Sequence, residues 1–404
     1  MYRIRPSSLA LTVACNASVL MQESVPPLPE TDDEAEGTAG HWVARRYVAG
    51  FGHELPVGAK FHSSGREWAV DMDMHAGAVM YARALGAPHP TLQIERTMPI
   101  PAVHPSEAGG TPDAWNYFPD ARVAYAVRPP EFPLEAFLAG LIKVIRVGDY
   151  KYGHRFVEIF EHLQLVGYYA GILDILNLSD TDPYLWIEMI LVQPRSYHRD
   201  GPVRVWRVQA SRLRNLLIAC NDAAGRALAD NIGGPFAPLA KTGPHCIDCK
   251  ARHVCKTLQV NVGALVDFAH TAERVELPPQ ALGQELAIVQ DAMKRLEARY
   301  EGLAAQAESL IRAGRAVPFY SMEAGQSRLS YLDNVNADEL VGLGDLIGVE
   351  LRRPLTLKDQ IVTPTQAVQL GIDESVMKAY AHRPPGKLKL ARDKSVTARK
   401  VFST

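Results

Sequence analysis

The sequence predicts an α/β fold in which a mixed central sheet is flanked by helices and followed by a helical C-terminal arm. Segments with β-strand character alternate with amphipathic helical segments through the first 262 residues, which is typical of α/β folds. Apolar residues then recur at alternating spacings of four and three, which predicts one long helix. The chain has 404 residues, enough for two or three domains, and its 47% hydrophobic content is ordinary for a globular protein.

The elements of the core follow from periodicity and from breaks at Gly and Pro. An acidic, proline-rich segment at 22–35 is expected to be a loop. After it we predict, in chain order, a helix over 33–49, a helix over 68–85, an extended run over 91–99, strands within 109–118 and 141–153, a helix over 155–176, strands over 184–193 and 202–208, and a helix over 211–231.

The predicted arm begins after Pro278-Pro279 and closes at Gly314. Its seam can pack on its own chain or on a second copy, so a homo-oligomer through the arm stays open. We expect a core over 1–262, the arm over 263–330, and a small region over 331–404 that ends in a basic tail. The seam consists of Leu282, Leu286, Val289, Met293, Leu296, Tyr300, Leu303, Ala307 and Leu310.

Composition limits the function and the location. No apolar run approaches the roughly 18 residues that a membrane span needs, so no membrane partner is expected. The formal net charge is −2, so any nucleic-acid binding must come from a local basic patch, such as the tail over 382–400. The apolar stretch after Arg5 is too short for a secretory signal, which favours the cytoplasm and reduced cysteines.

A set of polar residues around the predicted strand over 141–153 could bind a metal ion. Asp149 and Lys151 are two apart, so in a strand both project to one face. A carboxylate ligates a hard cation, and an ammonium beside it can orient a water or stabilise a phosphate. Asp113 starts another predicted strand, and His41 lies on the first predicted helix. An ordinary surface pair and a structural histidine are the alternative interpretations.

Two further polar residues lie on the predicted helix over 155–176. Its apolar stripe includes Leu163 and Val166, and Gln164 and Tyr168 fall on the opposite face. Because they are four residues apart, they are neighbours on the helix surface. Apolar residues border them, so this face is expected to be partly buried and to need polar partners.

The cysteines predict a second metal site. Cys246, Cys249 and Cys255 form a C-x2-C-x5-C run, and such clustering favours metal binding. Cys15 is the natural fourth ligand, with His245 or His253 as alternatives in a Zn²⁺ site. Spacing alone does not separate zinc from an iron–sulfur cluster. The fifth cysteine, Cys220, lies in an apolar helical segment and is expected to be a core residue.

Four short motifs carry a resemblance to a known family. "GTAGH", "GTPDAW", "DYKYGH" and "QLVGYY" occur in the order GTxxH, GxxD, DxK and QxxxY. This order resembles the RecB-like branch of the PD-(D/E)XK nucleases, and in particular a phage-encoded family first catalogued as a domain of unknown function. The resemblance covers about residues 5–260. It implies a restriction-endonuclease-like core, closed by a cysteine staple, and a DNA exonuclease that acts in phage recombination or replication.

The resemblance also implies roles for single residues. A divalent cation, Mg²⁺ or Mn²⁺, would be held by His41, Asp113 and Asp149 together with the backbone carbonyl of Tyr150. Lys151 would position the attacking water, and Gln164 and Tyr168 would hold the active site or the DNA backbone. The cysteine layout is similar to that of relatives in which one cysteine before the core and three after it bind a 4Fe–4S cluster, here Cys15, Cys246, Cys249 and Cys255. DNA is the implied partner, together with a phage single-strand annealing or binding protein.

One departure from the family pattern concerns the second carboxylate. Asp113 and Asp149 are separated by 35 intervening residues, so we interpret residues 121–141 as an insertion between two strands. Glu135, within that insertion, is the rival ligand, although it lacks the "GTPD" context. Two other classes of function also stay open: a non-catalytic DNA-binding scaffold with a metal-stapled fold, and a zinc-stabilised module unrelated to nucleases.

Overall fold

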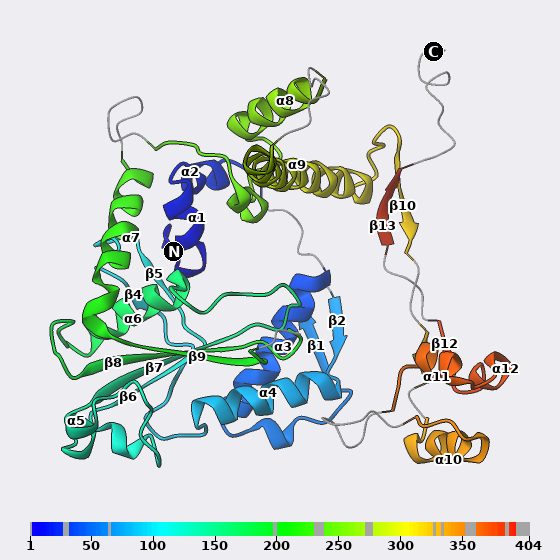
Figure 1. Ribbon diagram of the computed structural model, residues 1–404, viewed down its shortest axis with the longest axis horizontal. Helices are drawn as coiled ribbons and strands as arrows, with labels where there is room; N and C mark the ends of the chain where they lie inside the picture. Colours follow the sequence, from blue (N-terminus) through cyan, green and yellow to red (C-terminus); the bar gives the residue numbers. More distant parts are fainter. Residues whose placement is uncertain are drawn as a thin grey trace. The chain divides into compact units, whose positions relative to one another are not determined.

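A computed structural model gives the fold (Figure 1). The chain divides into two compact units, Met1–Leu303 and Ala304–Thr404, which are described separately. The predicted loop over 22–35 and the predicted basic tail over 382–400 lie partly outside the described residues. These are 2–26, 32–63, 66–196, 200–229, 238–270, 278–325, 329–332, 335–351, 361–383 and 388–392.

A five-stranded mixed sheet forms the centre of the first unit, which confirms the predicted fold class. β7 and β8 are parallel, whereas the other neighbouring strands are antiparallel. β7 and β8 are almost wholly buried and mostly apolar, as expected of strands covered on both faces, and the buried Arg146 of β7 pairs with Glu188 of β8. The strand order is β3 (Gln93–Ile94), β6 (Ala114–Phe118), β7 (Lys143–Tyr150), β8 (Leu185–Val192) and β9 (Val203–Gln209).

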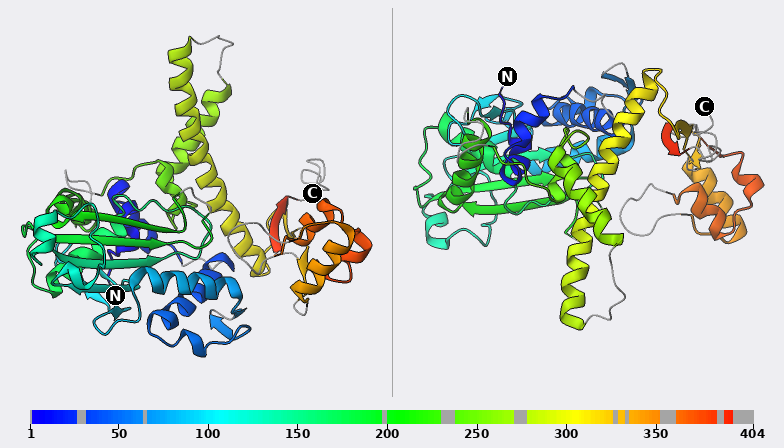
Figure 2. Two further views of the ribbon diagram at one scale, coloured as in Figure 1. Left: turned by 60° about the horizontal axis from the view of Figure 1, so that its bottom comes forward. Right: turned by 90° about the horizontal axis from the view of Figure 1, so that it is seen from above.

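Helices cover both faces of this sheet (Figure 2). α6 (Leu163–Ile175) connects the parallel strands β7 and β8, and it packs on one face together with α1 (Leu9–Ala14) and α7 (Arg214–Ala227). α3 (Asp32–Val48) and α4 (Met72–Leu85) cover the other face. α6 is apolar around most of its circumference, and such a helix is stable only when it is buried. Two separate apolar cores result, one on each face.

Two predicted helices begin later than the sequence indicated. Residues 66–69 form β2 (Arg66–Ala69), which pairs with β1 (Lys60–Ser63), and α4 starts only at Met72, where the Asp71 side chain accepts from Met74 N at 2.8 Å. The helix predicted from residue 155 starts at Leu163. Residues 155–162 are instead an irregular segment that side chains from β9 and from the residue after β8 hold in place.

Residues 121–141, interpreted from the sequence as an insertion, lie between β6 and β7. They contain a short 3-10 helix, η3 (Ala121–Val123), and α5 (Leu134–Leu138), which pack in a small apolar cluster beside the start of β7. Glu135 is exposed on α5. Because Asp149 lies near the opposite end of β7, the insertion does not bring Glu135 to Asp149.

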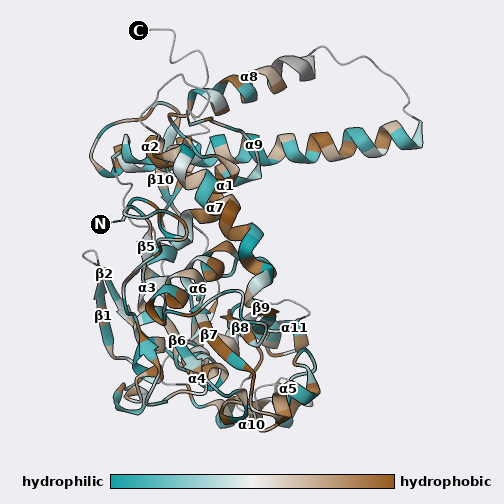
Figure 3. Cartoon of the chain, turned by 90° about the vertical axis from the view of Figure 1, so that its left-hand side faces the viewer, coloured by the Kyte–Doolittle hydropathy of each residue, from teal (hydrophilic) through white to brown (hydrophobic). Residues whose placement is uncertain are grey.

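A single long helix, α9 (Pro279–Arg312), forms the predicted arm and ends just before Gly314. Apolar and polar stretches alternate along it (Figure 3). Seam residues from Leu282 to Leu303 are exposed, whereas Ala298 and Gly302 are buried against the cysteine run and the start of α8 (Lys256–His270). Thus α9 packs on its own unit through small residues beside the seam. A second copy on the seam stays a prediction.

Smaller elements complete the two units. The first unit also contains η1 (Pro6–Ser8), α2 (Ser18–Glu23), η2 (Gly52–Glu54), β4 (Met98–Pro99), β5 (Gly109–Gly110), η4 (Ala210–Leu213), η5 (Pro244–Asp248) and α8 (Lys256–His270). The second unit pairs β10 (Tyr320–Ala324) with β13 (Leu388–Arg392) and β11 (Ser330–Tyr331) with β12 (Ala381–His382), beside α10 (Ala337–Ile347), α11 (Pro364–Leu370) and α12 (Glu374–Met377). Among the helices described, none is both long and apolar enough to cross a membrane.

Candidate functional site

The β6–β7 ladder brings Asp113 and Asp149 together. Ala114 pairs with Gly148, so the next positions of the antiparallel ladder are Asp113 and Asp149. The Asp113 Oδ2 atom accepts a hydrogen bond of 2.8 Å from the backbone N–H of Tyr150. The two carboxylates are thus fixed by main-chain pairing and not by flexible loops, although 35 residues separate them in the sequence.

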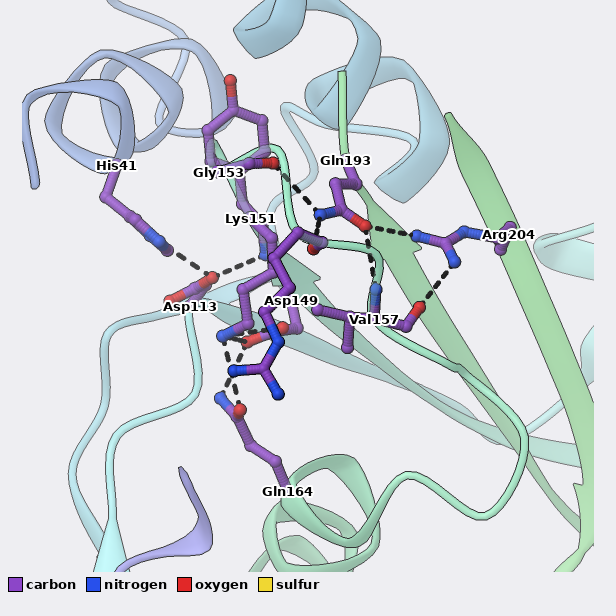
Figure 4. Close-up of polar contacts among 11 residues, drawn as sticks. His41, Asp113, Asp149, Lys151, Gly153, Val157, Gln164, Gln193 and Arg204 are labelled. Carbon is purple, nitrogen blue, oxygen red and sulfur yellow. Dashed lines mark hydrogen bonds and ion pairs between the residues drawn. The ribbon is translucent and has the colours of Figure 1, made fainter. Parts of the chain in front are cut away.

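Lys151 and Gln164 both contact the Asp149 carboxylate (Figure 4). Lys151 Nζ lies 3.0 Å from each Asp149 oxygen, and Gln164 Nε2 donates to Oδ1 at 2.8 Å. Lys151 also donates to Gln164 Oε1 at 3.3 Å. The Asp149 side chain is only 1% exposed, yet no described residue donates a hydrogen bond of acceptable geometry to its Oδ2 atom. Apart from the Lys151 ion pair, Oδ2 has no partner among the described residues and can accept a further ligand.

His41 approaches Asp113 from α3. Its Nδ1 atom lies 3.5 Å from Asp113 Oδ2, and its ring meets the edge of the Tyr150 ring at a centroid separation of 5.6 Å. The glycine before it makes this approach possible, because a Cβ atom at Gly40 would lie 2.7 Å from the Tyr152 ring. Within the "GTAGH" motif, Gly40 is needed for the close approach to Tyr152, and His41 supplies the imidazole that faces Asp113.

Tyr168 lies one turn beyond Gln164 on α6 and is buried. Burial, together with the negative charges of Asp149 and Asp113, raises the pKa of Tyr168 far above its usual value. Its hydroxyl is therefore neutral at physiological pH and acts as a hydrogen-bond donor. The prediction that this face of the helix is partly buried is confirmed.

The charges of the site act on one another. Burial raises the pKa of Asp113, an effect that His41 opposes and Asp149 reinforces. Burial alone lowers the pKa of Lys151, but the charges of Asp149 and Asp113 outweigh burial and raise it. Lys151 is therefore an ammonium ion at neutral pH. The centre has an excess of buried negative charge that one lysine does not neutralise, and this favours a cation.

The sequence prediction missed two pairs of residues around the centre. Glu95 has a positive φ of 46°, its N–H donates to the Asp113 carbonyl at 3.1 Å, and its carboxylate lies 2.7 Å from Arg45. Arg45 follows His41 by one helical turn, which was a usable signal, whereas no pattern marked Glu95. Gln193 and Arg204 hold the segment after Lys151 through the carbonyls of Gly153, Arg155 and Val157.

The second predicted site lies at the end of α1. Cys15 accepts a hydrogen bond from Lys241 N, Cys246 from Gly243 N, and Cys255 from Leu258 N, each at 3.4 Å. Cys249 packs on Leu11 of α1. The fold thus brings the N-terminal cysteine to the later cysteine run, and backbone N–H groups face three of the sulfurs. Such donors stabilise thiolates and sulfur-bound clusters.

His245 contacts the thiols. Hydrogen bonds to Cys15 and Cys246 raise the pKa of His245 to about 10. Burial raises the pKa of Cys15, but hydrogen bonds from His245 and Lys241 reverse this and lower it. His253 instead contacts the Lys250 carbonyl at 3.1 Å. Cys220 lies in the apolar core, where burial raises its pKa to about 11, which confirms it as a core residue.

The donor sets of both sites fit the expected metals. As the side chains stand, no group of three or more His, Cys, Asp or Glu in the described residues has the geometry to hold a metal ion. The first site nevertheless offers carboxylates, an imidazole and a backbone carbonyl, and the buried Oδ2 of Asp149 contacts only the Lys151 ammonium among the described residues. Hard divalent cations prefer such oxygen ligands. The second offers four thiols near one another, the donors of iron–sulfur clusters and of structural zinc.

The fold and the two sites define a mixed α/β protein with a carboxylate–lysine centre and a cysteine module. Residues 138–395 match the model of a family described as "Protein of unknown function (DUF2800)", and the chain belongs to that family. No curated protein matches the chain. The match includes Asp149, Lys151 and three of the clustered cysteines, whereas Cys15, His41 and Asp113 precede it.

Proposed function

We propose that this protein is a divalent-metal-dependent deoxyribonuclease of the PD-(D/E)XK superfamily, RecB-like branch. One observation carries the proposal: Lys151 and Gln164 both contact the buried Asp149 carboxylate, and the sheet register sets Asp113 beside it. An acidic pair with an adjacent ammonium can hold a divalent cation and stabilise charge on a phosphate, which supports metal-dependent phosphodiester hydrolysis. The order of the four sequence motifs supports the same assignment.

His41, Asp113 and Asp149, with the backbone carbonyl of Tyr150, are the proposed ligands of Mg²⁺ or Mn²⁺. When bound, such a cation activates a water and neutralises charge on the phosphate. Lys151 stays protonated, so its ammonium donates to the attacking water or to a phosphate oxygen. The Gln164 amide contacts both Lys151 and Asp149 and so holds the two side chains in place. The neutral Tyr168 hydroxyl would supply a further hydrogen-bond donor for the DNA backbone.

The cysteine module is the proposed site of a 4Fe–4S cluster held by Cys15, Cys246, Cys249 and Cys255, with Zn²⁺ as the alternative. Its role in this proposal is structural, because it joins the N-terminal helix to the end of the nuclease core. Action as an exonuclease on DNA ends, with a single-strand annealing or binding protein as partner, belongs to the same proposal.

Cleavage of end-labelled DNA tests the nuclease assignment. We expect the purified protein to degrade a labelled duplex or single strand with Mn²⁺ or Mg²⁺ and not with EDTA, and Asp149→Asn to be inactive. Glu135→Gln is the matched control, because that carboxylate is exposed and lies beside the opposite end of β7. Full cleavage by Asp149→Asn would contradict the proposal. DNA binding without cleavage by the wild type would favour the non-catalytic scaffold instead.

A further inference from the structure

A cavity of about 410 Å³ opens beside the edge strand β9, outside the carboxylate–lysine centre. This volume falls within the range of roughly 300 to 1,000 Å³ that is typical of ligand sites. Its wall combines aromatic and charged side chains, which is the composition of a site for a flat, polar ligand. The lining residues that matter here are Glu131, Phe160, Glu161, Trp206, Arg207 and Arg212.

Phe160 and Trp206 form an aromatic platform in this wall. Their ring centroids are 5.1 Å apart with an interplanar angle of 59°, and the Phe160 side chain is 59% exposed. Trp206 is half-buried. Exposing a large aromatic ring to water is unfavourable, so the arrangement is suited to a ligand that stacks on it.

The platform lies on the same face of the sheet as the carboxylate centre. Asp149 pairs with Leu191, and Trp206 pairs with Met189, two residues earlier on β8. Residues two apart on a strand share a face, so Trp206 and Asp149 project to the same side. From the spacing of strands and the rise per residue, about 4.8 Å and 3.3 Å, their Cα atoms are on the order of 12 Å apart. A few nucleotides of one strand span that distance.

One irregular segment joins the two places. It starts at Lys151, is held by Gln193 and Arg204, carries Phe160, and leads into α6 with Gln164. The backbone next to Phe160 is strained, because Glu161 has a φ of 53°. A non-glycine residue in the left-handed region persists only where the surrounding structure imposes it, often at functional sites. The position of Phe160 is therefore fixed by the same segment that carries the proposed catalytic lysine.

The charged groups of the cavity suit a nucleotide. Arg212 is exposed and makes no ion pair or side-chain hydrogen bond with a described residue, so it is available for a phosphate. Arg207 lies 2.6 Å from the buried Glu188 and 3.5 Å from Glu131, so its charge is already balanced. Glu161 supplies carboxylate oxygens, which accept hydrogen bonds from exocyclic amino groups of bases.

We propose that this cavity is a base-stacking subsite for the single-stranded end of the DNA substrate, with one nucleobase on Phe160 and Trp206 and its phosphate near Arg212. Stacking on aromatic rings beside a cationic group is the general mode by which proteins bind single strands. The subsite rests on the proposed nuclease function and refines it, because it makes single-stranded DNA at the end of the substrate the form that is bound.

The test is the dissociation constant of a fluorescent oligo-deoxycytidylate, measured by anisotropy at one fixed salt concentration without divalent cations. Phe160→Ala is expected to bind the single strand about tenfold more weakly, the loss for one stacked base. Phe160→Tyr keeps the ring and should restore binding, and Arg212→Ala should weaken it. Phe51→Ala, at another exposed phenylalanine outside the cavity, is the control and should bind as the wild type does.

The outcomes separate this inference from the nuclease assignment. If the wild type binds and cleaves DNA but Phe160→Ala binds the single strand with unchanged affinity, the subsite is wrong and the nuclease stands. An equal loss on a blunt duplex of the same length also overturns it, because a stacked base must be unpaired. If the wild type binds no DNA, both proposals fail. Weaker single-strand binding by Phe160→Ala, with duplex binding unchanged, supports the subsite.

Discussion

The carboxylate–lysine centre and the cysteine module are each built from segments far apart in the sequence, but different forces hold them. At the first, the β6–β7 ladder and the buried strand β7 fix Asp113 and Asp149 within a large apolar core. The second lies between short elements, α1 and η5, and its buried neighbours form two small clusters, such as the one with Leu258 and Ala298. Ala298 of α9 also packs against the module, beside Cys246.

This difference has a consequence for the role of the metals. A site fixed by main-chain pairing keeps its geometry with or without an ion, so loss of the cation should affect chemistry more than stability. A site among few apolar contacts depends on its cross-link, so loss of the cluster should affect stability first. The two regions should therefore respond in opposite ways to the removal of a ligand.

The largest effect is expected at Lys151. Lys151→Met removes the ammonium beside Asp149, and we expect DNA cleavage to fall on the order of 10²- to 10³-fold. The melting temperature measured with Mn²⁺ bound should change little, because the cation offsets the lost positive charge beside Asp149. Lys143→Met is the matched control, because that lysine lies on the same strand, 2.8 Å from Asp182, at the far end from the site. Rates on end-labelled DNA and thermal unfolding curves measure both effects. A large fall in the melting temperature of Lys151→Met with Mn²⁺ bound would contradict the proposed difference between the two regions.

The next effect is on stability. Cys249→Ser is expected to lower the free energy of unfolding by about 4 kcal/mol or more and to reduce bound iron or zinc, because a ligand of the cross-link is lost. Cys220→Ala, at the buried core cysteine, should keep the metal. Denaturant unfolding measures the change in the free energy of unfolding, and metal analysis measures the bound iron or zinc. Equal metal content in Cys249→Ser and the wild type would show that Cys249 is not a ligand.

A smaller effect of opposite sign is expected at Asp113, whose pKa burial raises. Asp113 contributes its full stabilising effect below its ordinary pKa of 3.8, and this contribution is lost as pH rises through the higher folded-state pKa, because ionisation of the buried carboxyl is unfavourable. Without divalent cations, Asp113→Asn should therefore melt slightly higher than the wild type at neutral pH, and the difference should shrink as pH falls toward 3.8. A variant that melts lower at neutral pH contradicts the assigned burial effect.

The smallest effect concerns the exposed Arg45–Glu95 ion pair. Glu95→Gln removes a negative charge near His41 and frees Arg45, so DNA affinity should rise about two- to threefold at low salt, and stability should change by less than about 1 kcal/mol. Glu54→Gln, whose partner is Arg46 at 3.6 Å, is the control. Weaker DNA binding by Glu95→Gln would mean that Glu95 itself supports the site.

The sequence allowed the central pair to be predicted because strand periodicity is a local property. Asp149 and Lys151 stand at the end of a mostly apolar segment, which predicts a buried strand with both side chains on one face. The chain order of the motifs predicted that Asp113 lies on a separate strand. The layout of the cysteines likewise predicted that Cys15 would lie near the later run. The spacing of Asp149 and Lys151 is visible in one chain, whereas the roles of Asp113 and Cys15 came from the resemblance to a known family.

Features that depend on contacts between distant segments could not be predicted. The helix was predicted to begin at residue 155, but Gln193 and Arg204 hold the stretch before Leu163 as an irregular segment. Glu95 takes its unusual φ because β3 pairs with β6 immediately before it. On α9, the heptad pattern predicted packing through the seam, but Ala298, which lies outside the seam, packs closely on Cys246 and Leu258 because its side chain is small.

Binding of Mn²⁺ is the most direct test of the central claim that His41, Asp113 and Asp149 form one metal site. Electron paramagnetic resonance titrations of the wild type, Asp149→Asn and Glu135→Gln measure free against bound Mn²⁺. The account predicts one site per chain in the wild type and in Glu135→Gln, and its loss in Asp149→Asn. Unchanged Mn²⁺ binding in Asp149→Asn, or loss of binding in Glu135→Gln, would contradict it.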